Sequence, residues 1–423
     1  MLKSISVTVL ANAYVQAVST LIFLLTARFY GVEGRGIYAS ATSMGTFSTT
    51  MLGLSVGMVL PFFVVDSGVP RREFFARTLT TVVALVLGLS LAALAAVFVA
   101  YAVDPKLLGK VPPLYLAAVG ISFPYFMWVG SSGFIFSAAG EIVQENRITV
   151  VNRTAFLIVS SGLVVFGRVS LLTYLLLYGA FNITQMVREI WFLSRWCNAE
   201  LVFDGALARR ILRKGLTMHS VTIASLLNTS FSILTLNYYS QDLKDVGYFN
   251  FAGQLTAIIA MVPIVVSRYL ISEITASDRL TVWPRQKRIM AYSCVFTAGV
   301  CGAAYFLIVP FCQFFKAEFL NAVPVFRFLL LAVLPSSYVI LMQSQWYSSG
   351  QFKLMSAVNI GVGIAGAIIT LIAVPHYHEM GAGATTLFTY LTLFGINVVF
   401  HFRLNRDARR AVVRGVPQAS PSA

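Results

Sequence analysis

Long apolar stretches, separated by short charged or Gly- and Pro-containing segments, run along the whole chain of 423 residues. Because about 20 consecutive apolar residues in a helix cross the hydrocarbon core of a bilayer, such stretches predict membrane-spanning helices. We expect twelve of these helices. They lie at 7–29, 38–64, 78–102, 114–137, 150–167, 171–193, 216–239, 248–272, 289–312, 324–347, 355–374 and 381–401.

The composition agrees with a chain that is embedded in lipid. Hydrophobic residues make up 58% of it and charged residues 11%, with a mean hydropathy of +0.79. An ordinary soluble domain carries about 25% charged residues, so this chain has too little polar surface to coat a soluble globule. A cytosolic enzyme, a disordered scaffold and a secreted disulfide module are thereby excluded. The fold class that we expect is an all-α polytopic membrane protein.

The net charge of +15 orients the predicted helices. With both termini in the cytoplasm, 23 of the 31 Lys and Arg residues lie on the cytoplasmic side. Basic residues collect in cytoplasmic loops, so this distribution predicts that orientation. The orientation accounts for the positive charge, and we expect no nucleic-acid partner. The N-terminus has one charge, Lys3, and no small-residue cleavage site, which predicts an uncleaved first helix. The four cysteines have no metal or disulfide spacing, so we interpret them as small packing residues. We expect no metal site and no cofactor.

Residues 194–215 are the longest connection, and they alternate basic and apolar positions. This pattern predicts a short amphipathic helix on the inner leaflet. It divides the chain into an N-terminal six-helix bundle at 1–193, a cytoplasmic amphipathic linker at 194–215, a C-terminal six-helix bundle at 216–402 and a basic cytoplasmic tail at 403–423.

The two halves share a sequence pattern. Gly34-Arg35-Gly36-Ile37-Tyr38-Ala39 opens the second segment, and Asp245-Val246-Gly247-Tyr248-Phe249-Asn250 opens the eighth, with Gly36 and Gly247 separated by 211 residues. Gly140 and Gly350, after the fourth and tenth segments, are separated by 210 residues. We therefore predict two six-helix bundles related by a pseudo-twofold along the membrane normal, the arrangement of many alternating-access transporters.

The segment Ala27-Arg28-Phe29-Tyr30-Gly31-Val32-Glu33-Gly34-Arg35-Gly36-Ile37-Tyr38-Ala39 resembles one that is typical of the polysaccharide flippase family. Leu52-Gly53-Leu54-Ser55-Val56-Gly57, Gly350-Gln351-Phe352-Lys353 and Gly381-Ala382-Gly383-Ala384 resemble that family too. It belongs to the multidrug/oligosaccharidyl-lipid/polysaccharide exporter superfamily.

The resemblance implies a multi-pass protein of the bacterial inner membrane that is not an enzyme. It would translocate undecaprenyl-diphosphate-linked oligosaccharide by alternating access, for O-antigen, capsule or exopolysaccharide synthesis. The partners it implies are the lipid-linked oligosaccharide, membrane lipids, and polysaccharide polymerase and chain-length proteins.

Such a substrate needs a polar cavity, and two predicted helices offer a polar face. In the first segment, Asn12, Gln16, Ser19 and Thr20 share one face. In the seventh, most of the polar residues share another face, which includes Asn228. The alternative is that Ser and Thr bond to carbonyls one turn back and only hold packed helices together. A side-chain amide can form several hydrogen bonds, so Asn12, Gln16 and Asn228 favour the interpretation as a polar cavity.

The diphosphate needs cations, and four arginines are candidates: Arg28, Arg153, Arg268 and Arg327. Each lies near a predicted helix end, so snorkelling to the lipid headgroups is the alternative. His219 is either a ligand or titrating switch, or a packed, hydrogen-bonded histidine. Tyr and Trp residues of the fourth and tenth segments are candidates for sugar recognition or for interfacial anchoring. They are Tyr125, Trp128, Tyr338 and Trp346.

All 16 acidic residues lie in predicted loops or near predicted helix ends. A cation-coupled multidrug exporter of the same superfamily usually has a carboxylate inside the membrane, so this distribution disfavours that alternative. A membrane-embedded, lipid-dependent glycosyltransferase or polymerase would need acid/base or metal-binding carboxylates, and the acidic residues here are scattered. We therefore predict no catalytic residues.

Overall fold

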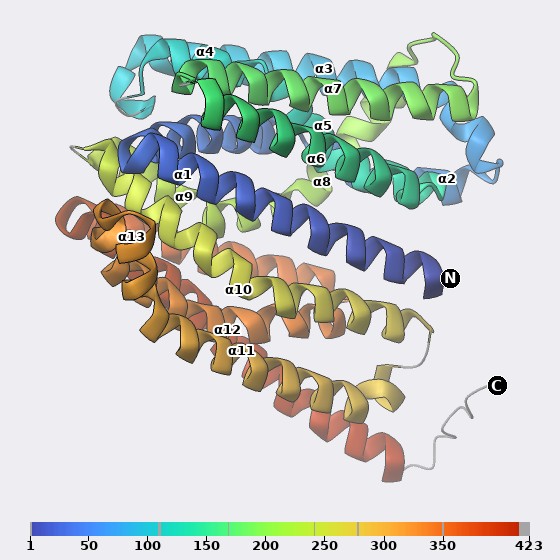
Figure 1. Ribbon diagram of the computed structural model, residues 1–423. Coiled ribbons are helices and arrows are strands. Elements are labelled where there is room, and N and C mark those ends of the chain that lie inside the picture. Colours follow the sequence, from blue (N-terminus) through green and yellow to red (C-terminus); the bar gives the residue numbers. More distant parts are fainter. Residues whose placement is uncertain are drawn as a thin grey trace. The chain divides into compact units, whose positions relative to one another are not determined.

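A computed structural model describes residues 2–108, 111–167, 169–240, 242–276, 279–348 and 351–413. All regular structure within these ranges is helical, which confirms the expected all-α fold (Figure 1). The chain forms two compact units, and each is described here by itself. The first unit comprises Met1–Leu226 and Ile233–Asn250, and the second comprises Leu227–Ser232 and Phe251–Ala423.

The first unit begins with α1, which spans Leu2–Leu52 and holds the first predicted segment and much of the second. Its helical geometry is interrupted at Gly31, whose φ of 68° lies in the left-handed region that favours glycine. The helices that follow are α2 (Val56–Ser67), α3 (Arg71–Val103), α4 (Pro113–Gly120), α5 (Phe123–Ala139), α6 (Ile142–Gly167), α7 (Leu171–Cys197), α8 (Gly205–Thr229), α9 (Phe231–Tyr239) and the start of α10 (Leu243–Ala276), with a short 3-10 helix at Pro105–Leu108.

The second unit contains Leu227–Ser232, where α8 ends and α9 begins, the rest of α10 and the last three α-helices. These are α11 (Arg279–Phe315), α12 (Val323–Ser348) and α13 (Phe352–Val413), with a 3-10 helix at Ala317–Ala322. α13 holds the eleventh and twelfth predicted segments and is interrupted at His378. The core of the second unit includes the stacked rings of Trp346 and Phe400, whose centroids are 4.0 Å apart.

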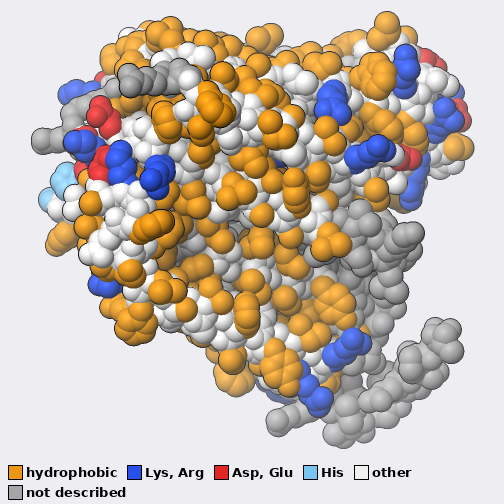
Figure 2. Space-filling model, viewed as in Figure 1, with side chains coloured by type: hydrophobic (Ala, Val, Ile, Leu, Met, Phe, Trp, Pro, Cys, Tyr) orange, Lys and Arg blue, Asp and Glu red, His pale blue; other side chains and the backbone are white. Residues whose placement is uncertain are grey.

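By length and apolar composition, seven helices in the described part of the chain can cross a membrane, or eight if the bent pair α4 and α5 counts as one span. Two of the seven are long stretches: Leu10–Ser67 runs from α1 through α2, and Leu354–Arg406 lies within α13, so each holds two predicted segments. Large apolar side chains are exposed on the helices, for example Val295, Phe306 and Phe314 on α11. Figure 2 shows hydrophobic side chains spread over the visible face. These features describe a multi-pass membrane protein whose helices contact lipid.

Residues 194–215 do not form the separate amphipathic helix that the sequence pattern predicts. Asp204 caps α8 by accepting hydrogen bonds from the N–H groups of Ala206 and Leu207, both at 2.9 Å, and α8 then continues to Thr229. Leu207 and Ile211 are buried in the core of the first unit. The apolar face therefore packs on protein, because α2 and α3 supply apolar partners that the sequence pattern alone does not reveal.

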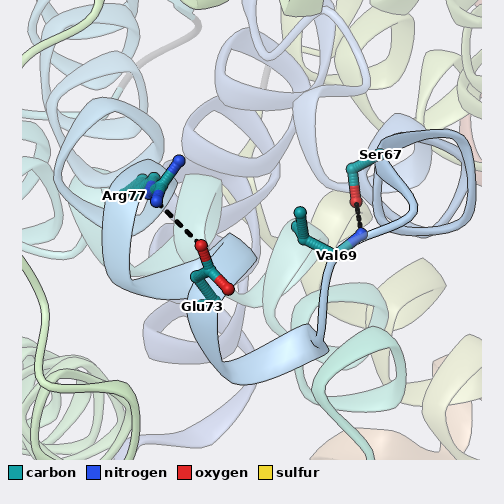
Figure 3. Close-up of polar contacts among 4 residues, drawn as sticks. All are labelled: Ser67, Val69, Glu73 and Arg77. Carbon is teal, nitrogen blue, oxygen red and sulfur yellow. Dashed lines mark hydrogen bonds and ion pairs between the residues drawn. The ribbon is translucent and has the colours of Figure 1, made fainter.

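The turn between α2 and α3 lies in the same unit, and exposed charged residues follow it on α3 (Figure 3). Gly68 adopts a left-handed φ of 67°, and the Val69 N–H donates to the Ser67 Oγ at 3.4 Å. On the first turns of α3, the Arg77 guanidinium forms an ion pair of 2.7 Å with Glu73. Both side chains are exposed, so this pair contributes little to stability.

Candidate functional site

The kink at Gly31 is followed by a buried arginine. Arg35 is 4% exposed, whereas the candidate Arg28 on the same helix is exposed. The predicted segments end at 29 and begin again at 38, which places Arg35 in a loop. In the structure α1 continues past Gly31, so Arg35 lies on a helix inside the first unit. The buried cation of this region is therefore Arg35.

Only neutral groups surround the Arg35 guanidinium among the described residues. Its Nη1 donates to the Thr26 Oγ1 at 3.1 Å, and its Nη2 donates to the Asn250 Oδ1 at 2.7 Å. The group also lies over the rings of Phe23 and Tyr38, at 4.6 and 4.8 Å from their centroids. Its Nε has no hydrogen-bond partner there, and no described carboxylate forms an ion pair with it. A buried charge is normally paired, so this guanidinium has capacity for an anion.

Next to Arg35 lies a group of aromatic residues that we call the tyrosine cluster: Tyr30, Tyr38, Tyr174 and Tyr178. Its ring centroids are 5.7 to 6.2 Å apart, and α1 and α7 supply the side chains. Phe156 of α6 packs against Tyr174 and Tyr178. Tyr178 also contacts Phe126 of α5, with centroids 6.5 Å apart. The cluster therefore links Arg35 to α5.

Phe126 lines a cavity of about 130 Å³ in the first unit. Its lining also comprises Thr49, Thr50, Gly53, Ser55, Met58, Met127, Gly130, Ser131 and Thr222. The cavity lies where the second predicted segment breaks between α1 and α2, with Leu54 and Ser55 in left-handed conformations. Non-helical backbone at membrane depth is tolerated where it lines a polar cavity, and the hydroxyl groups here supply such a lining.

His219 of α8 is a buried, hydrogen-bonded residue at this break. Its Nε2 lies 2.8 Å from the Met51 carbonyl oxygen, and its Nδ1 lies 3.1 Å from the Ser55 Oγ. The Ser55 Oγ also lies 2.8 Å from the Thr222 Oγ1. The last carbonyls of a helix lack intrahelical donors, so the imidazole satisfies one such group and joins α8 to the break. These contacts are those of a packed, hydrogen-bonded histidine, and a role of His219 as a ligand or titrating switch stays a prediction.

Arg153 of α6 contributes to a buried polar network. Its Nη2 donates to the Tyr125 hydroxyl at 3.1 Å. Trp128, on the same helix as Tyr125, is fully buried and donates its Nε1–H to Glu189 at 2.6 Å. Trp346 in the second unit is also buried and donates to Asn397 at 2.8 Å. These two tryptophans therefore pack inside the units. Their roles in sugar recognition or interfacial anchoring stay predictions.

The other candidates are dispersed. Asn12 donates its Nδ2–H to the Thr8 carbonyl one turn back at 2.7 Å, while Gln16 and Thr20 are half-buried. Arg327, in the second unit, lies over the Tyr305 ring at 4.5 Å. The side chains of Asn228 and Arg268 lie outside the described residues. A substrate role for each of these residues stays a prediction.

Sequence reasoning missed two buried charges, Arg35 and Glu189. Arg35 falls between the predicted segments because a charged residue flanked by glycines interrupts the apolar run. Glu189 lies near the predicted end at 193, yet α7 continues to Cys197. One signal was present for Glu189, because Gln185 and Glu189 are four residues apart and share a helix face.

Comparisons with known proteins concern the fold. No family model and no curated protein matches the chain. A structure of the lipid II flippase MurJ in an inward closed conformation matches with a TM-score of 0.74 and 14% identity, over 98% of this chain and 93% of that one. An inward-facing multidrug resistance MATE family transporter of the MOP superfamily matches with a TM-score of 0.62 and 11% identity, over 93% and 96%.

A MOP superfamily transporter from Pyrococcus furiosus matches with a TM-score of 0.54 and 10% identity, over 95% of this chain and 96% of that one. These neighbours are transporters rather than enzymes. At identities this low, the matches show the fold alone. They confirm the resemblance noted in the sequence at the level of the fold. The chain has the two-unit helical fold shared by the MurJ flippase and the MATE transporters of the MOP superfamily.

Proposed function

We propose that the chain is a flippase that translocates undecaprenyl-diphosphate-linked oligosaccharide across the bacterial inner membrane by alternating access. It would serve O-antigen, capsule or exopolysaccharide synthesis, with both termini in the cytoplasm. The observation that carries this proposal is the buried Arg35 guanidinium, whose partners among the described residues are neutral. The fold, which resembles that of the lipid II flippase MurJ, supports it.

The chemistry of the substrate explains why such an arginine is useful. Removing water from each sugar hydroxyl costs about 1–7 kcal/mol, depending on the reference state, and an ionised diphosphate costs far more. A guanidinium presents several N–H donors in a planar fork that matches phosphate oxygens. Thr26 and Asn250 accept from Arg35 through single neutral oxygens. Diphosphate oxygens would replace these acceptors with stronger, charge-assisted ones when α1 and α10 separate.

The rest of the head group would contact the neighbouring surfaces. Tyrosine rings offer an apolar face and a hydroxyl, which suits a sugar that has both kinds of surface. The cavity beside Phe126 offers the hydroxyls of Thr49, Thr50 and Ser55. The polyprenyl tail would remain in lipid, and no covalent bond would be made or broken. A polysaccharide polymerase and a chain-length protein would then use the delivered unit.

A cation-coupled multidrug exporter is the second candidate. One observation favours it, namely that Glu189 is a carboxylate buried in a helix of the first unit. The predicted segments place all acidic residues in loops or near helix ends, which disfavours this function. The two candidates differ in substrate, so a transport assay separates them.

The test uses purified protein in liposomes that contain a fluorescent polyprenyl-diphosphate oligosaccharide in one leaflet. A membrane-impermeant quencher reports how much of the label becomes accessible in the other leaflet. We expect accessibility to rise with the native protein and to stay at background with heat-inactivated protein. Uptake of a cationic dye without movement of the labelled lipid would contradict the flippase and support the exporter.

A further inference from the structure

The connection between α7 and α8 presents three consecutive large apolar side chains to the outside of the first unit. Leu201 is 93% exposed, and Val202 and Phe203 are each 57% exposed. We call these three residues the apolar loop. A contiguous exposed apolar patch of this kind marks a surface that contacts a membrane or another protein. The helices beside the loop distinguish between these two partners.

Hydrogen bonds hold both ends of the apolar loop on α3. Before the loop, the Glu200 N–H donates to the Ala76 carbonyl oxygen at 2.8 Å, and the Thr80 hydroxyl donates to the Glu200 carbonyl oxygen at 2.6 Å. After the loop, the Asp204 N–H donates to the Thr81 Oγ1 at 2.9 Å. The exposure of the three side chains is therefore built into the fold, because the backbone on either side of them is attached to a long helix.

The attachment points on α3 lie where that helix passes from charged to apolar surroundings. Its first turns carry the exposed ion pair of Glu73 and Arg77 (Figure 3). Farther along α3, Leu87 and Leu91 are exposed apolar residues. An exposed ion pair requires water or lipid headgroups, whereas an exposed apolar helix surface in a membrane protein faces acyl chains. The apolar loop, attached between residues 76 and 81, is therefore level with the membrane–water boundary.

The end of α7 indicates the same boundary. Trp191 is 56% exposed, and the Arg195 guanidinium lies 4.6 Å from the centroid of its indole ring. Tryptophan is enriched at membrane–water interfaces, and an arginine near a helix end extends its charge toward the headgroups. The pair lies on the last two turns of α7, which ends at Cys197. Both helices next to the apolar loop thus reach the interface close to it.

The backbone of the apolar loop is incompatible with the hydrocarbon core. Among the described residues, no group forms a hydrogen bond with the main chain of Leu201, Val202 or Phe203. Hydrocarbon cannot satisfy such groups, whereas water and lipid headgroups can. Glu200 and Asp204, exposed on either side of the loop, also require polar surroundings. A main chain that needs water and side chains that favour lipid are both accommodated at the interface.

We propose that the apolar loop inserts its three side chains among lipid acyl chains just below the headgroups and thereby anchors the connection between α7 and α8 to the bilayer surface. Lipid is the partner because exposed apolar residues continue along α3 and because Trp191 and Arg195 lie on the adjoining helix end. The anchor determines where α8 begins, and α8 carries His219 at the break between α1 and α2. This inference goes beyond the proposed function, since it concerns the surrounding lipid and not a transported one.

Photo-crosslinking of the native protein tests the proposal. The protein is reconstituted in liposomes of phosphatidylethanolamine and phosphatidylglycerol that contain a diazirine phospholipid, with the diazirine either close to the ester group or at the end of the acyl chain. Trypsin releases the loop within residues 196–209, and tandem mass spectrometry locates the adduct. We expect adducts on Leu201, Val202 and Phe203 chiefly with the diazirine close to the ester group.

Leu91, exposed on α3, is the internal reference for lipid contact in this experiment. Labelling of Leu91 without labelling of the apolar loop by either phospholipid would overturn the proposal and would leave a protein partner as the occupant. Labelling of the loop chiefly by the diazirine at the chain end would also overturn it, because the loop would then lie in the hydrocarbon core.

A charged variant tests whether the side chains themselves hold the loop in lipid. In Leu201→Asp, the adduct yield on the loop should fall at least about five-fold, because a charged side chain is unfavourable among acyl chains. Val69→Asp, which changes an exposed valine in the turn between α2 and α3, is the matched control, and its yield should stay within about two-fold of the native yield. Equal yields for the two variants would contradict insertion. Neither experiment requires lipid translocation, so failure here is distinguishable from failure of the proposed function.

Discussion

An Arg35→Gln variant is expected to translocate the labelled lipid at least about ten-fold more slowly than the native protein. Hydrogen bonds to a charged group contribute about 1.5–3 kcal/mol each, and one such loss already corresponds to a factor of about ten. Glutamine keeps a hydrogen-bond donor on a shorter side chain and removes the charge. Arg35→Lys should restore part of the rate, since lysine keeps the charge but lacks the planar fork. The measurement is the initial rate in the liposome assay.

The matched control for this prediction is Arg210→Gln. Arg210 is exposed on the first turns of α8, so its loss changes the net charge by the same amount without touching the tyrosine cluster. Its rate should stay within about two-fold of the native rate. Equal rates for Arg35→Gln and Arg210→Gln would remove Arg35 from the mechanism.

The second large effect is expected at Gly36 and Gly247. A Cβ on Gly36 would overlap the Leu243 carbonyl oxygen, and a Cβ on Gly247 would overlap the Val32 carbonyl oxygen. Gly36→Ala and Gly247→Ala should each lower the free energy of unfolding by about 1–3 kcal/mol, because the backbones must move apart. Thermal unfolding in detergent, followed by tryptophan fluorescence, measures the change.

Gly253→Ala, also on α10, is the control for both glycines. Nothing lies within 4 Å of the position that its Cβ would take. Alanine is favoured over glycine inside a helix by about 1 kcal/mol, so this variant should be slightly more stable than the native protein. Destabilisation as large as that of Gly36→Ala would show that the close contact is not the cause.

These glycines also bear on the internal repeat. Gly36 and Gly247 are the equivalent positions of the two copies, 211 residues apart, and Val32 and Leu243 are separated by the same interval. Each glycine therefore faces the carbonyl four residues before its counterpart, within the first unit. The contact is reciprocal, as a twofold relation between the two copies would make it. Arg35 and Asn250 lie in the two copies of this motif, so the repeat also positions the buried guanidinium.

The sequence predicted the helical segments well, because the hydropathy of a stretch depends only on the residues in that stretch. All twelve predicted segments fall on helical stretches, including the two that share α13. It did not predict the break at Leu54 and Ser55, where no proline or charge interrupts the apolar run. It also did not predict that α8 starts before the seventh segment, because the partners of Leu207 and Ile211 are distant in sequence.

The candidate site was predicted less completely, since its contacts join residues far apart in the chain. Trp128 and Glu189 are separated by 61 positions, and Arg35 and Asn250 by 215. A single sequence places a charge near a helix end but does not reveal which helix covers it. The need for an arginine and a polar cavity came from the chemistry of the substrate. The tertiary structure was needed to show which of the arginines is buried.

The central claim is that the Arg35 guanidinium binds the diphosphate of a lipid-linked sugar. Native mass spectrometry of the purified protein titrated with undecaprenyl diphosphate tests it most directly, with undecaprenol, which lacks the diphosphate, as the reference ligand. We predict that Arg35→Gln raises the Kd for the diphosphate by about ten-fold or more and leaves the Kd for undecaprenol unchanged. Equal Kd values of the native protein and Arg35→Gln for undecaprenyl diphosphate would contradict the claim.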